Sequence, residues 1–256
     1  MGIFRRANNF VTRKLPLKSV RSRLERPLAN ITFDDFPKSA WTVAGPILER
    51  FGAKATYYAS GRFCGAREDG IDYFDAEDLR AAHRAGHEIG AHSFAHQMTP
   101  LVSSAELAAD ETRNAAALCE ILGGVGGGGA TRPSSYAYPY GEVSPRTKAL
   151  MGKLFANARG IRPGVNAGRI DLAQLLAVPI EHRRWRPDEI AAAVAEAKAN
   201  NGWLILFTHD VCDHPSPFGC TPQMLSEVLE MLAAAAIPVT PVKHAMAEAV
   251  FGARAD

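Results

Sequence analysis

The chain has 256 residues, 47% of them hydrophobic, and a formal net charge of +2, which suits one large α/β domain or two small ones. Its four irregularly spaced cysteines exclude a disulfide-based scaffold in a chain of this length. No stretch approaches the ~18 apolar residues of a membrane span, and the first residues lack the apolar run of a signal peptide. We therefore expect a protein of a reducing compartment, the bacterial cytoplasm.

The first 29 residues form a basic arm. They carry eight Lys or Arg against one acid, which leaves 21 bases against 26 acids in the remaining body. Apolar residues recur in the arm at helical spacing, at Ile3, Phe4, Ala7, Phe10 and Val11. Such a segment can lie on an anionic membrane surface, and the alternative is an arm packed on its own domain or on a neighbouring subunit. The body, 30–256, is expected to be one domain, and its mild acidity gives no indication of nucleic-acid binding.

From residue 30 onward, strand-like and helix-like runs alternate. In chain order we predict a strand at 31–33, a helix at 39–51, a strand at 55–59, a helix at 75–86, a strand at 87–92, a helix at 103–122, a strand at 135–139, a helix from 145, a strand at 154–159, a strand at 175–180, a helix at 187–200, a strand at 203–208, a helix from 222, a strand at 237–240 and a helix from 242. Strands separated by helices predict parallel strands with right-handed crossovers, and about seven such units favour an α/β barrel. The glycine-rich run at 123–130 lacks a following Lys-Ser or Lys-Thr, so we interpret it as a connector and not as a phosphate-binding loop.

Acidic and histidine side chains gather where the predicted strands end. Asp34 and Asp35 follow the first strand of the body, and His209 follows the strand at 203–208. His92 and His96 are four residues apart, a spacing that places both imidazoles on one face of a helical turn. The C-terminal ends of parallel strands are where the chemistry of such folds gathers. Two histidines and one carboxylate can hold Zn²⁺ and leave a position open for water.

Four motifs identify a resemblance to a known family. They are Thr32-Phe33-Asp34-Asp35, His92-Ser93-Phe94-Ala95-His96, Ala137-Tyr138-Pro139-Tyr140-Gly141 and Phe207-Thr208-His209-Asp210. In this order, over roughly residues 30–240, they resemble the polysaccharide deacetylases, the carbohydrate esterases of family four that share the NodB homology domain. The resemblance implies an irregular (β/α) barrel and metal-dependent removal of N-acetyl groups from the sugars of a polysaccharide or its cell-envelope precursor.

The resemblance also implies roles for individual residues. Asp35, His92 and His96 would bind a divalent metal, with Zn²⁺ favoured, and Asp34 would take a proton from the attacking water. His209 matches the general acid that protonates the departing nitrogen.

Two further roles concern the acetyl group. The backbone N–H of Tyr140 matches the group that helps to hold the oxyanion. Phe207, at a position usually filled by leucine, is expected to form the acetyl pocket together with Tyr138 and Pro139, and the alternative is that its ring only packs in the core.

The sequence departs from the family pattern at two places. In many members the third motif begins with an arginine that contacts the base, and here that position is Ala137. Arg159, at the end of the next predicted strand, is our candidate for the missing charge, with a surface arginine as the alternative. The fourth motif has Trp185 but not the usual aspartate before it, which leaves open the group that orients His209.

The loop that follows His209 contains Cys212, His214 and Cys220. Their spacing fits no usual zinc pattern, and a Cys212–Cys220 disulfide is not expected in a reducing compartment. We therefore interpret this segment as a loop that faces the substrate.

Three interpretations of function follow. The first is a metal-dependent carbohydrate N-deacetylase, acting in the cytoplasm and able to contact the inner membrane face through residues 1–29. The second keeps the metal but hydrolyses another amide, such as a formyl sugar or a cyclic imide. The third is an inactive sugar- or metal-binding module. The sugar, the metal used in the cell and the oligomeric state stay open.

Overall fold

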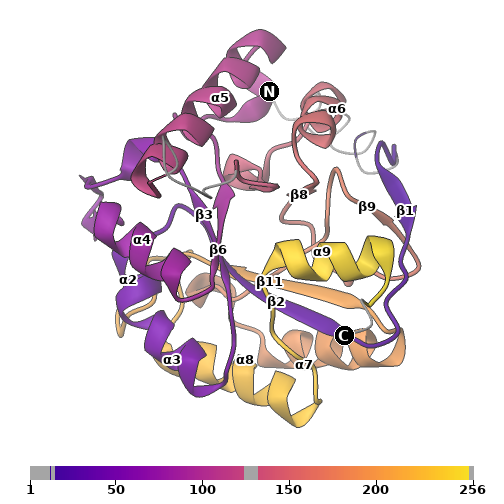
Figure 1. Cartoon of the computed structure of the whole chain (residues 1–256). Helices are drawn as coiled ribbons and strands as arrows, with labels where there is room; N and C mark the ends of the chain where they lie inside the picture. Colours follow the sequence, from indigo (N-terminus) through magenta and orange to yellow (C-terminus); the bar gives the residue numbers. More distant parts are fainter. Residues whose placement is uncertain (1–11, 13–14, 124–131, 254–256) are drawn as a thin grey trace.

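A computed structural model describes residue 12 and residues 15–123 and 132–253 (Figure 1). The apolar positions expected to form an amphipathic helix, 3–11, lie outside these ranges, as does the glycine-rich stretch 124–130. Among the described residues, no helix has the length and apolar character needed to cross a membrane.

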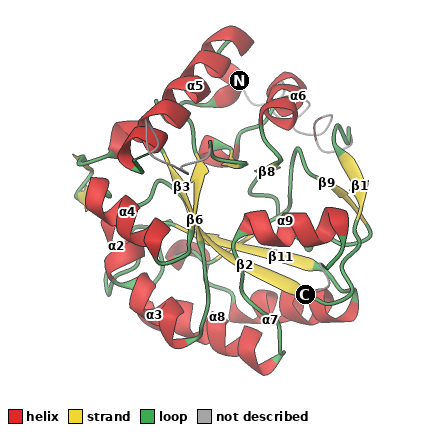
Figure 2. Ribbon diagram, viewed as in Figure 1, coloured by secondary structure: helices red, strands yellow, loops and turns green. Residues whose placement is uncertain are grey.

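A seven-stranded sheet forms the centre of the fold, with helices packed around its outside (Figure 2). Its strands, in spatial order, are β10 (Val178–Pro179), β11 (Trp203–Thr208), β2 (Leu28–Phe33), β3 (Thr56–Ala59), β6 (Glu88–Ala91), β7 (Ser135–Ala137) and β8 (Asn157–Arg159). All neighbouring pairs are parallel. The central pair β2 and β11 is buried at every position because one face lines the interior and the other lies under helices. The predicted α/β architecture of about seven parallel strands is confirmed.

The two edge strands of this curled sheet approach each other through the segment that precedes β10. Leu175 exchanges backbone hydrogen bonds with β8, donating to Ala158 and accepting from Gly160. A few residues later, Val178 and Pro179 pair with β11. The segment thus bridges β8 and β11, which gives the sheet its distorted barrel form.

The helices are α2 (Lys38–Thr42), α3 (Ala44–Arg50), α4 (Ala76–Arg84), α5 (Ser104–Ile121), α6 (Pro145–Leu154), α7 (Pro187–Ala199), α8 (Pro222–Ala234) and α9 (Val242–Phe251). Short 3-10 turns lie at η1 (Gly61–Phe63), η2 (Thr99–Leu101), η3 (Pro139–Gly141) and η4 (His182–Arg184). Ser103 and Glu106 form a capping box that begins α5, where each side chain binds the backbone N–H of the other.

Two predicted elements differ from the structure, and two pairs of short strands were not predicted. The helix expected at 39–51 is interrupted at Val43, because Pro46 has no N–H to donate to the carbonyl of Thr42. The strand expected at 237–240 is reduced to an isolated bridge between Ala29 and Val239. Two short antiparallel pairs were not expected: β1 (Ser19–Arg21) with β9 (Arg169–Asp171), and β4 (Arg67–Glu68) with β5 (Ile71–Asp72).

The described part of the basic arm packs on the rest of the domain. β1 pairs with β9, and the buried ammonium of Lys148 donates to the carbonyls of Thr12 and Leu15 at 2.9 Å each. The same ammonium lies 2.7 Å from the carboxylate of Asp171. These contacts satisfy all three donors of a lysine that is 2% exposed.

The last helix begins at the N-terminal ends of the barrel strands. The N–H of Lys243 donates to the carboxylate of Glu88 at 2.8 Å, and the N–H of Val242 donates to the hydroxyl of Thr56 at 2.9 Å. Thr56 in turn donates to Glu88. Glu88 and Thr56 therefore accept from the first two N–H groups of α9, and the buried carboxylate faces the positive end of the helix. This helix start lies at the opposite strand ends from those that carry the two aspartates.

Candidate metal centre and active site

Asp34 and Asp35 lie at the C-terminal end of β2, where the backbone turns sharply. The N–H of Asp34 still donates to the carbonyl of Thr208 on β11, and then Asp35 and Phe36 take positive φ angles of 64° and 57°. Phe36 holds this turn, since its buried ring packs on Tyr57 with a centroid distance of 4.5 Å. The left-handed backbone sends the two neighbouring carboxylates to different partners, at a conformational cost that functional sites often carry.

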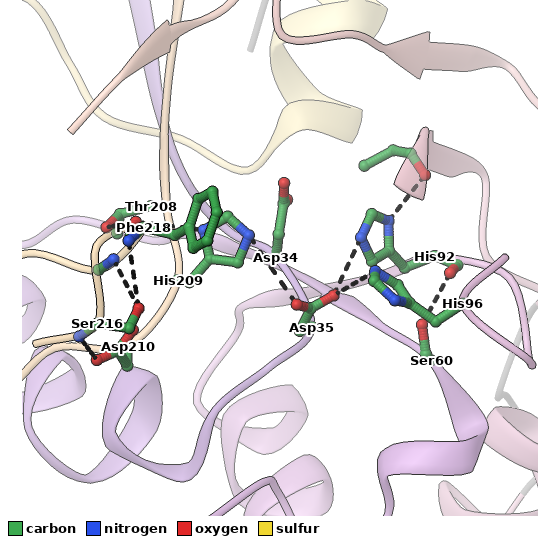
Figure 3. Close-up of polar contacts among 12 residues, drawn as sticks. Asp34, Asp35, Ser60, His92, His96, Thr208, His209, Asp210, Ser216 and Phe218 are labelled. Atoms are coloured by element: carbon green, nitrogen blue, oxygen red, sulfur yellow. Dashed lines mark hydrogen bonds and ion pairs between the residues drawn. The ribbon is translucent and has the colours of Figure 1, made fainter. Parts of the chain in front are cut away.

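Asp35 lies between two imidazoles and His209 (Figure 3). Its Oδ1 lies 3.2 Å from Nε2 of His92 and 2.9 Å from Nε2 of His96. Despite these distances, Oδ1 is buried and has no hydrogen-bond partner of acceptable geometry, which leaves it available to a cation. Ligands of one small cation lie at such separations when each bond measures about 2.0–2.2 Å. These three residues fit a divalent metal.

The orientation of His92 is fixed from behind. Its Nδ1 lies 2.8 Å from the carbonyl oxygen of Ala137, which can only accept, so Nδ1 carries the proton and Nε2 presents its lone pair to Asp35. Burial opposes ionisation of Asp35, but the two imidazoles hold the pKa of this carboxyl well below its ordinary value. Burial likewise opposes protonation of His92, and contact with Asp35 raises the pKa of the imidazole in spite of it. The group therefore offers an ionised carboxylate to a cation.

The segment from His92 to His96 is a bent loop, so the expectation of a helical turn is wrong. Ser93 and His96 have positive φ angles of 56° and 50°. The carboxylate of Asp110 on α5 holds the loop by accepting from the N–H of Phe94 at 2.7 Å and of Ala95 at 3.1 Å. No sequence pattern indicated this role for Asp110, because a single acid on a helix has many possible roles.

Asp34 is paired with Arg159, whose guanidinium contacts its carboxylate. Arg159 is fully buried, donates also to the carbonyl of Gly160 and lies between the rings of Tyr58 and Phe207, at 5.2 and 4.9 Å from their centroids. The expected approach of Arg159 to Asp34 is confirmed, and the alternative of a surface arginine is wrong.

The position of Arg159 explains how it reaches this carboxylate. Arg159 on β8 stands in register with Ala137 on β7, as direct neighbours in the parallel pair. Residues in register on neighbouring strands direct their side chains to the same face of a sheet. The guanidinium that the third motif lacks at Ala137 is therefore present one strand away.

His209 lies on the opposite side of Asp35 from His92 and His96 (Figure 3). Its Nε2 lies 3.9 Å from Oδ2 of Asp35, and its side chain is 21% exposed. Its Nδ1 lies 3.3 Å from the carbonyl oxygen of Phe218. The sequence did not indicate this carbonyl as a partner.

A cleft of about 630 Å³ opens over these groups, and Asp34, Asp35, His92, His96 and His209 all line it. Phe207 lines it as well, as expected for an acetyl pocket. Tyr140, on η3 with a φ angle of 58°, is half exposed at the rim, and its ring centroid lies 4.6 Å from that of His96.

Tyr138 and Pro139 do not line this cleft, which corrects the expectation for both. Tyr138 is 1% exposed and points into the core, where its hydroxyl donates to the carbonyl of Ala173 at 2.9 Å. Pro139 is buried beneath the turn that carries Tyr140. Their contribution is to hold that turn in place.

The loop after His209 contains free thiols. Cys212 and Cys220 are joined by a backbone hydrogen bond and not by a disulfide. Burial raises the pKa of the Cys220 thiol to about 12, so it is neutral at ordinary pH. Within the described ranges, only one group of three or more His, Cys, Asp or Glu side chains is close enough to share a metal ion. It consists of Asp35, His92 and His96.

The curled parallel sheet and the group Asp35, His92 and His96 are those of a polysaccharide deacetylase-type barrel. A comparison with family models identifies the same family. The model for polysaccharide deacetylases matches residues 21–157, more than half of the chain. The chain belongs to the polysaccharide deacetylase family. Among curated proteins, no sequence matches it.

Solved structures share the fold at low sequence identity. A family 4 acetyl xylan esterase from Clostridium thermocellum, in complex with a cobalt ion, is 23% identical with a TM-score of 0.58, over 85% of this chain and 89% of that chain. A family 4 carbohydrate esterase from Streptomyces lividans, in complex with acetate, is 19% identical with a TM-score of 0.55, over 83% and 91%. A CE4 family pseudoenzyme from Bacillus anthracis is 14% identical with a TM-score of 0.60, over 91% and 69%.

Proposed function

We propose that this protein is a metal-dependent hydrolase that removes N-acetyl groups from sugars of a polysaccharide or its precursor. The observation that carries the proposal is the arrangement of one carboxylate, Asp34, and one imidazole, His209, around the group formed by Asp35, His92 and His96. Amide hydrolysis needs a base for the attacking water and an acid for the departing amine, and the cleft offers one candidate for each.

Asp35, His92 and His96 would hold the metal. Two imidazoles and one carboxylate suit Zn²⁺, although a cobalt ion is present in the relative from Clostridium thermocellum. A divalent metal bound there would supply a Lewis acid that polarises the acetyl carbonyl and lowers the pKa of water to about 7.

The other residues have separate tasks. Asp34, held by Arg159, takes the proton of the attacking water, and His209 donates a proton to the departing nitrogen. The N–H of Tyr140 donates to the carbonyl oxygen as negative charge develops on it. Phe207 supplies an apolar wall for the acetyl methyl group.

Two alternatives remain distinct from this proposal. A cleft of this size also admits other small amides, such as a formylated sugar or a cyclic imide. An inactive module is the other, because a pseudoenzyme stands among the structural relatives. The presence of all five residues of the proposed metal and proton-transfer set in one cleft favours an active enzyme.

Metal analysis and acetate release test the proposal together. We expect about one divalent ion per chain and release of acetate from N-acetylglucosamine oligosaccharides. Acetylated xylan and an N-formyl sugar would serve as comparison substrates. Bound metal without hydrolysis of any of them would identify an inactive module, and hydrolysis of the formyl sugar alone would identify the second alternative.

We further propose that residues 30–256 are the catalytic domain and that the basic arm, 1–29, brings it to the inner membrane face. The arm carries eight bases, and each base near an anionic surface adds about 1 kcal/mol of attraction. On this proposal the substrate is a cytoplasmic glycan precursor.

A further inference from the structure

His209 lacks the side-chain carboxylate that the family's fourth motif usually supplies. Among the described residues, the one carboxylate within ion-pair distance of His209 is Asp35, which lies on the Nε2 side of the ring. The Nδ1 side faces the carbonyl oxygen of Phe218. We propose that the loop 210–220, clamped by Asp210 and Ser216, replaces this carboxylate and orients His209 through the Phe218 carbonyl.

A carbonyl oxygen fixes the tautomer of a neutral histidine. Because the oxygen can only accept a hydrogen bond, Nδ1 must carry the proton, and Nε2 then faces the cleft with its lone pair free. A protonated His209 keeps the same orientation and directs its Nε2–H into the cleft, where the proposed function places the departing nitrogen. Without a partner on Nδ1, a partly exposed imidazole would sample both tautomers and other ring angles.

The clamp holds this carbonyl in place. Oδ2 of Asp210 accepts from the N–H of Ser216 at 2.7 Å, and Oδ1 accepts from its hydroxyl at 2.5 Å. The serine hydroxyl in turn accepts from the N–H groups of Phe218 at 3.3 Å and of Gly219 at 3.2 Å. Asp210 itself is 5% exposed, so its carboxylate holds Ser216 from the buried side of the loop (Figure 3). The residue directly after His209 thus fixes the carbonyl that holds His209.

Close packing against Asp210 leaves no space for a side chain at Gly219. A Cβ on Gly219 would lie 2.4 Å from both the carbonyl oxygen and Oδ1 of Asp210, so a side chain there would break the clamp.

The residues just before Trp185 of the fourth motif, 181–183, contact the loop and support it. The N–H of His182 donates to Gly219 at 2.7 Å, and that of Arg183 donates to Pro217 at 3.2 Å. The guanidinium of Arg183 lies 4.1 Å from the centroid of the Phe218 ring and donates to the buried Glu181. The segment that carries an orienting aspartate elsewhere therefore acts here indirectly, by supporting the loop.

The tautomer of His209 tests this role without any substrate, so the result does not depend on the proposed function. In the metal-loaded protein labelled with ¹⁵N-histidine, long-range ¹H–¹⁵N correlations report which ring nitrogen carries the proton, and His209→Gln assigns the signals. We expect a protonated Nδ1 in the wild type and a mixture of tautomers in Ser216→Ala. Ser216→Thr keeps the hydroxyl and should restore the wild-type pattern. Ser226→Ala on α8, which removes a hydroxyl that donates only within its own helix, is the matched control.

Kinetics supply a second readout if the enzyme proves active. Ser216→Ala should lower kcat by about 10- to 100-fold, part of the ~10²- to 10⁴-fold that a general acid contributes, with KM and metal content close to wild type. A wild-type His209 protonated at Nε2 when neutral would overturn the inference. So would a Ser216→Ala protein that is folded and keeps the wild-type tautomer.

Discussion

Arg159 and Asp34 contact each other across 125 positions of sequence, inside the barrel and away from solvent. The guanidinium comes from the strand beside Ala137, in register with it, although family members often carry the arginine at that position itself. The charge beside the candidate base is thus preserved in space although its place in the sequence has changed.

Moving the arginine from position 159 to position 137 tests whether its place on the strand matters. Arg159→Ala should lower kcat by about 10²-fold or more, because Asp34 loses the group that holds it, and breaking a buried pair also costs about 3–5 kcal/mol of stability. The double variant Ala137→Arg, Arg159→Ala returns the guanidinium to the adjacent strand and should recover part of the activity. Acetate release and thermal unfolding measure both effects.

Ala137→Arg alone is the control for steric damage, since two arginines would then compete for one carboxylate. A stable, folded Arg159→Ala protein with wild-type kcat would show that Asp34 needs no cationic partner.

Substitutions at the two neighbouring aspartates should separate metal binding from proton transfer. Asp35→Ala, His92→Ala and His96→Ala each remove one of three ligands and should abolish both bound metal and hydrolysis. Asp34→Asn should retain the metal and lose at least ~10²-fold in kcat, as expected for a general base. Elemental analysis beside the acetate assay distinguishes the two classes. Loss of metal from Asp34→Asn would reverse the roles assigned to Asp34 and Asp35.

The sequence predicted the parallel strands and most of the candidate site residues, because both follow from local patterns, but it wrongly placed Tyr138 and Pro139 in the cleft. Apolar runs marked the long strands, and Asp34, Asp35 and His209 stood directly at strand ends. The shape of the His92–His96 loop could not be predicted from the sequence. It depends on positive φ angles and on a hydrogen bond to Asp110, which is distant in sequence. The short strands of the two antiparallel pairs, β1 with β9 and β4 with β5, were missed because their pairing depends on tertiary contacts and not on periodicity.

Glu111 should make stability depend on pH. Its side chain is 1% exposed on α5, and burial, together with the charge of Asp110, raises its pKa to about 8 from an ordinary 4.5. Between these values the folded state keeps a proton that the unfolded chain releases. This contribution to stability is therefore complete below pH 4.5, declines as the pH rises, and is lost above about pH 8.

Glu111→Gln removes this titration while keeping a similar shape. The difference in unfolding free energy between wild type and variant, measured by urea denaturation from pH 5 to 9, should shift in favour of the variant as pH rises. A difference that stays constant over this range would mean that Glu111 is ionised in the folded protein.

The membrane proposal can be tested without disturbing β1, which pairs with β9. Replacing the four most N-terminal bases (Arg5, Arg6, Arg13 and Lys14) by Gln should weaken binding to anionic vesicles by about 10³-fold at low salt, at about 1 kcal/mol per charge. The matched control replaces four exposed bases on helices of the body (Arg50, Arg84, Lys153 and Lys198) and should bind as the wild type does. Equal sedimentation of both variants with the vesicles would show that the arm does not bind the membrane.

The hydrogen bond between Lys243 and Glu88 spans 155 positions, and this separation has a consequence for synthesis on the ribosome. At about 5–20 residues per second, roughly 10 to 30 seconds pass between the appearance of Glu88 and that of the backbone N–H it accepts from. During this interval the carboxylate of Glu88 can accept from the hydroxyl of Thr56 but not from the N–H of Lys243, and a buried group left with an unmade hydrogen bond costs about 1–3 kcal/mol. The strands of the sheet and all the side chains of the proposed metal centre are therefore made before α9, and the contacts of Glu88 and Thr56 with this helix can form only after it has been made.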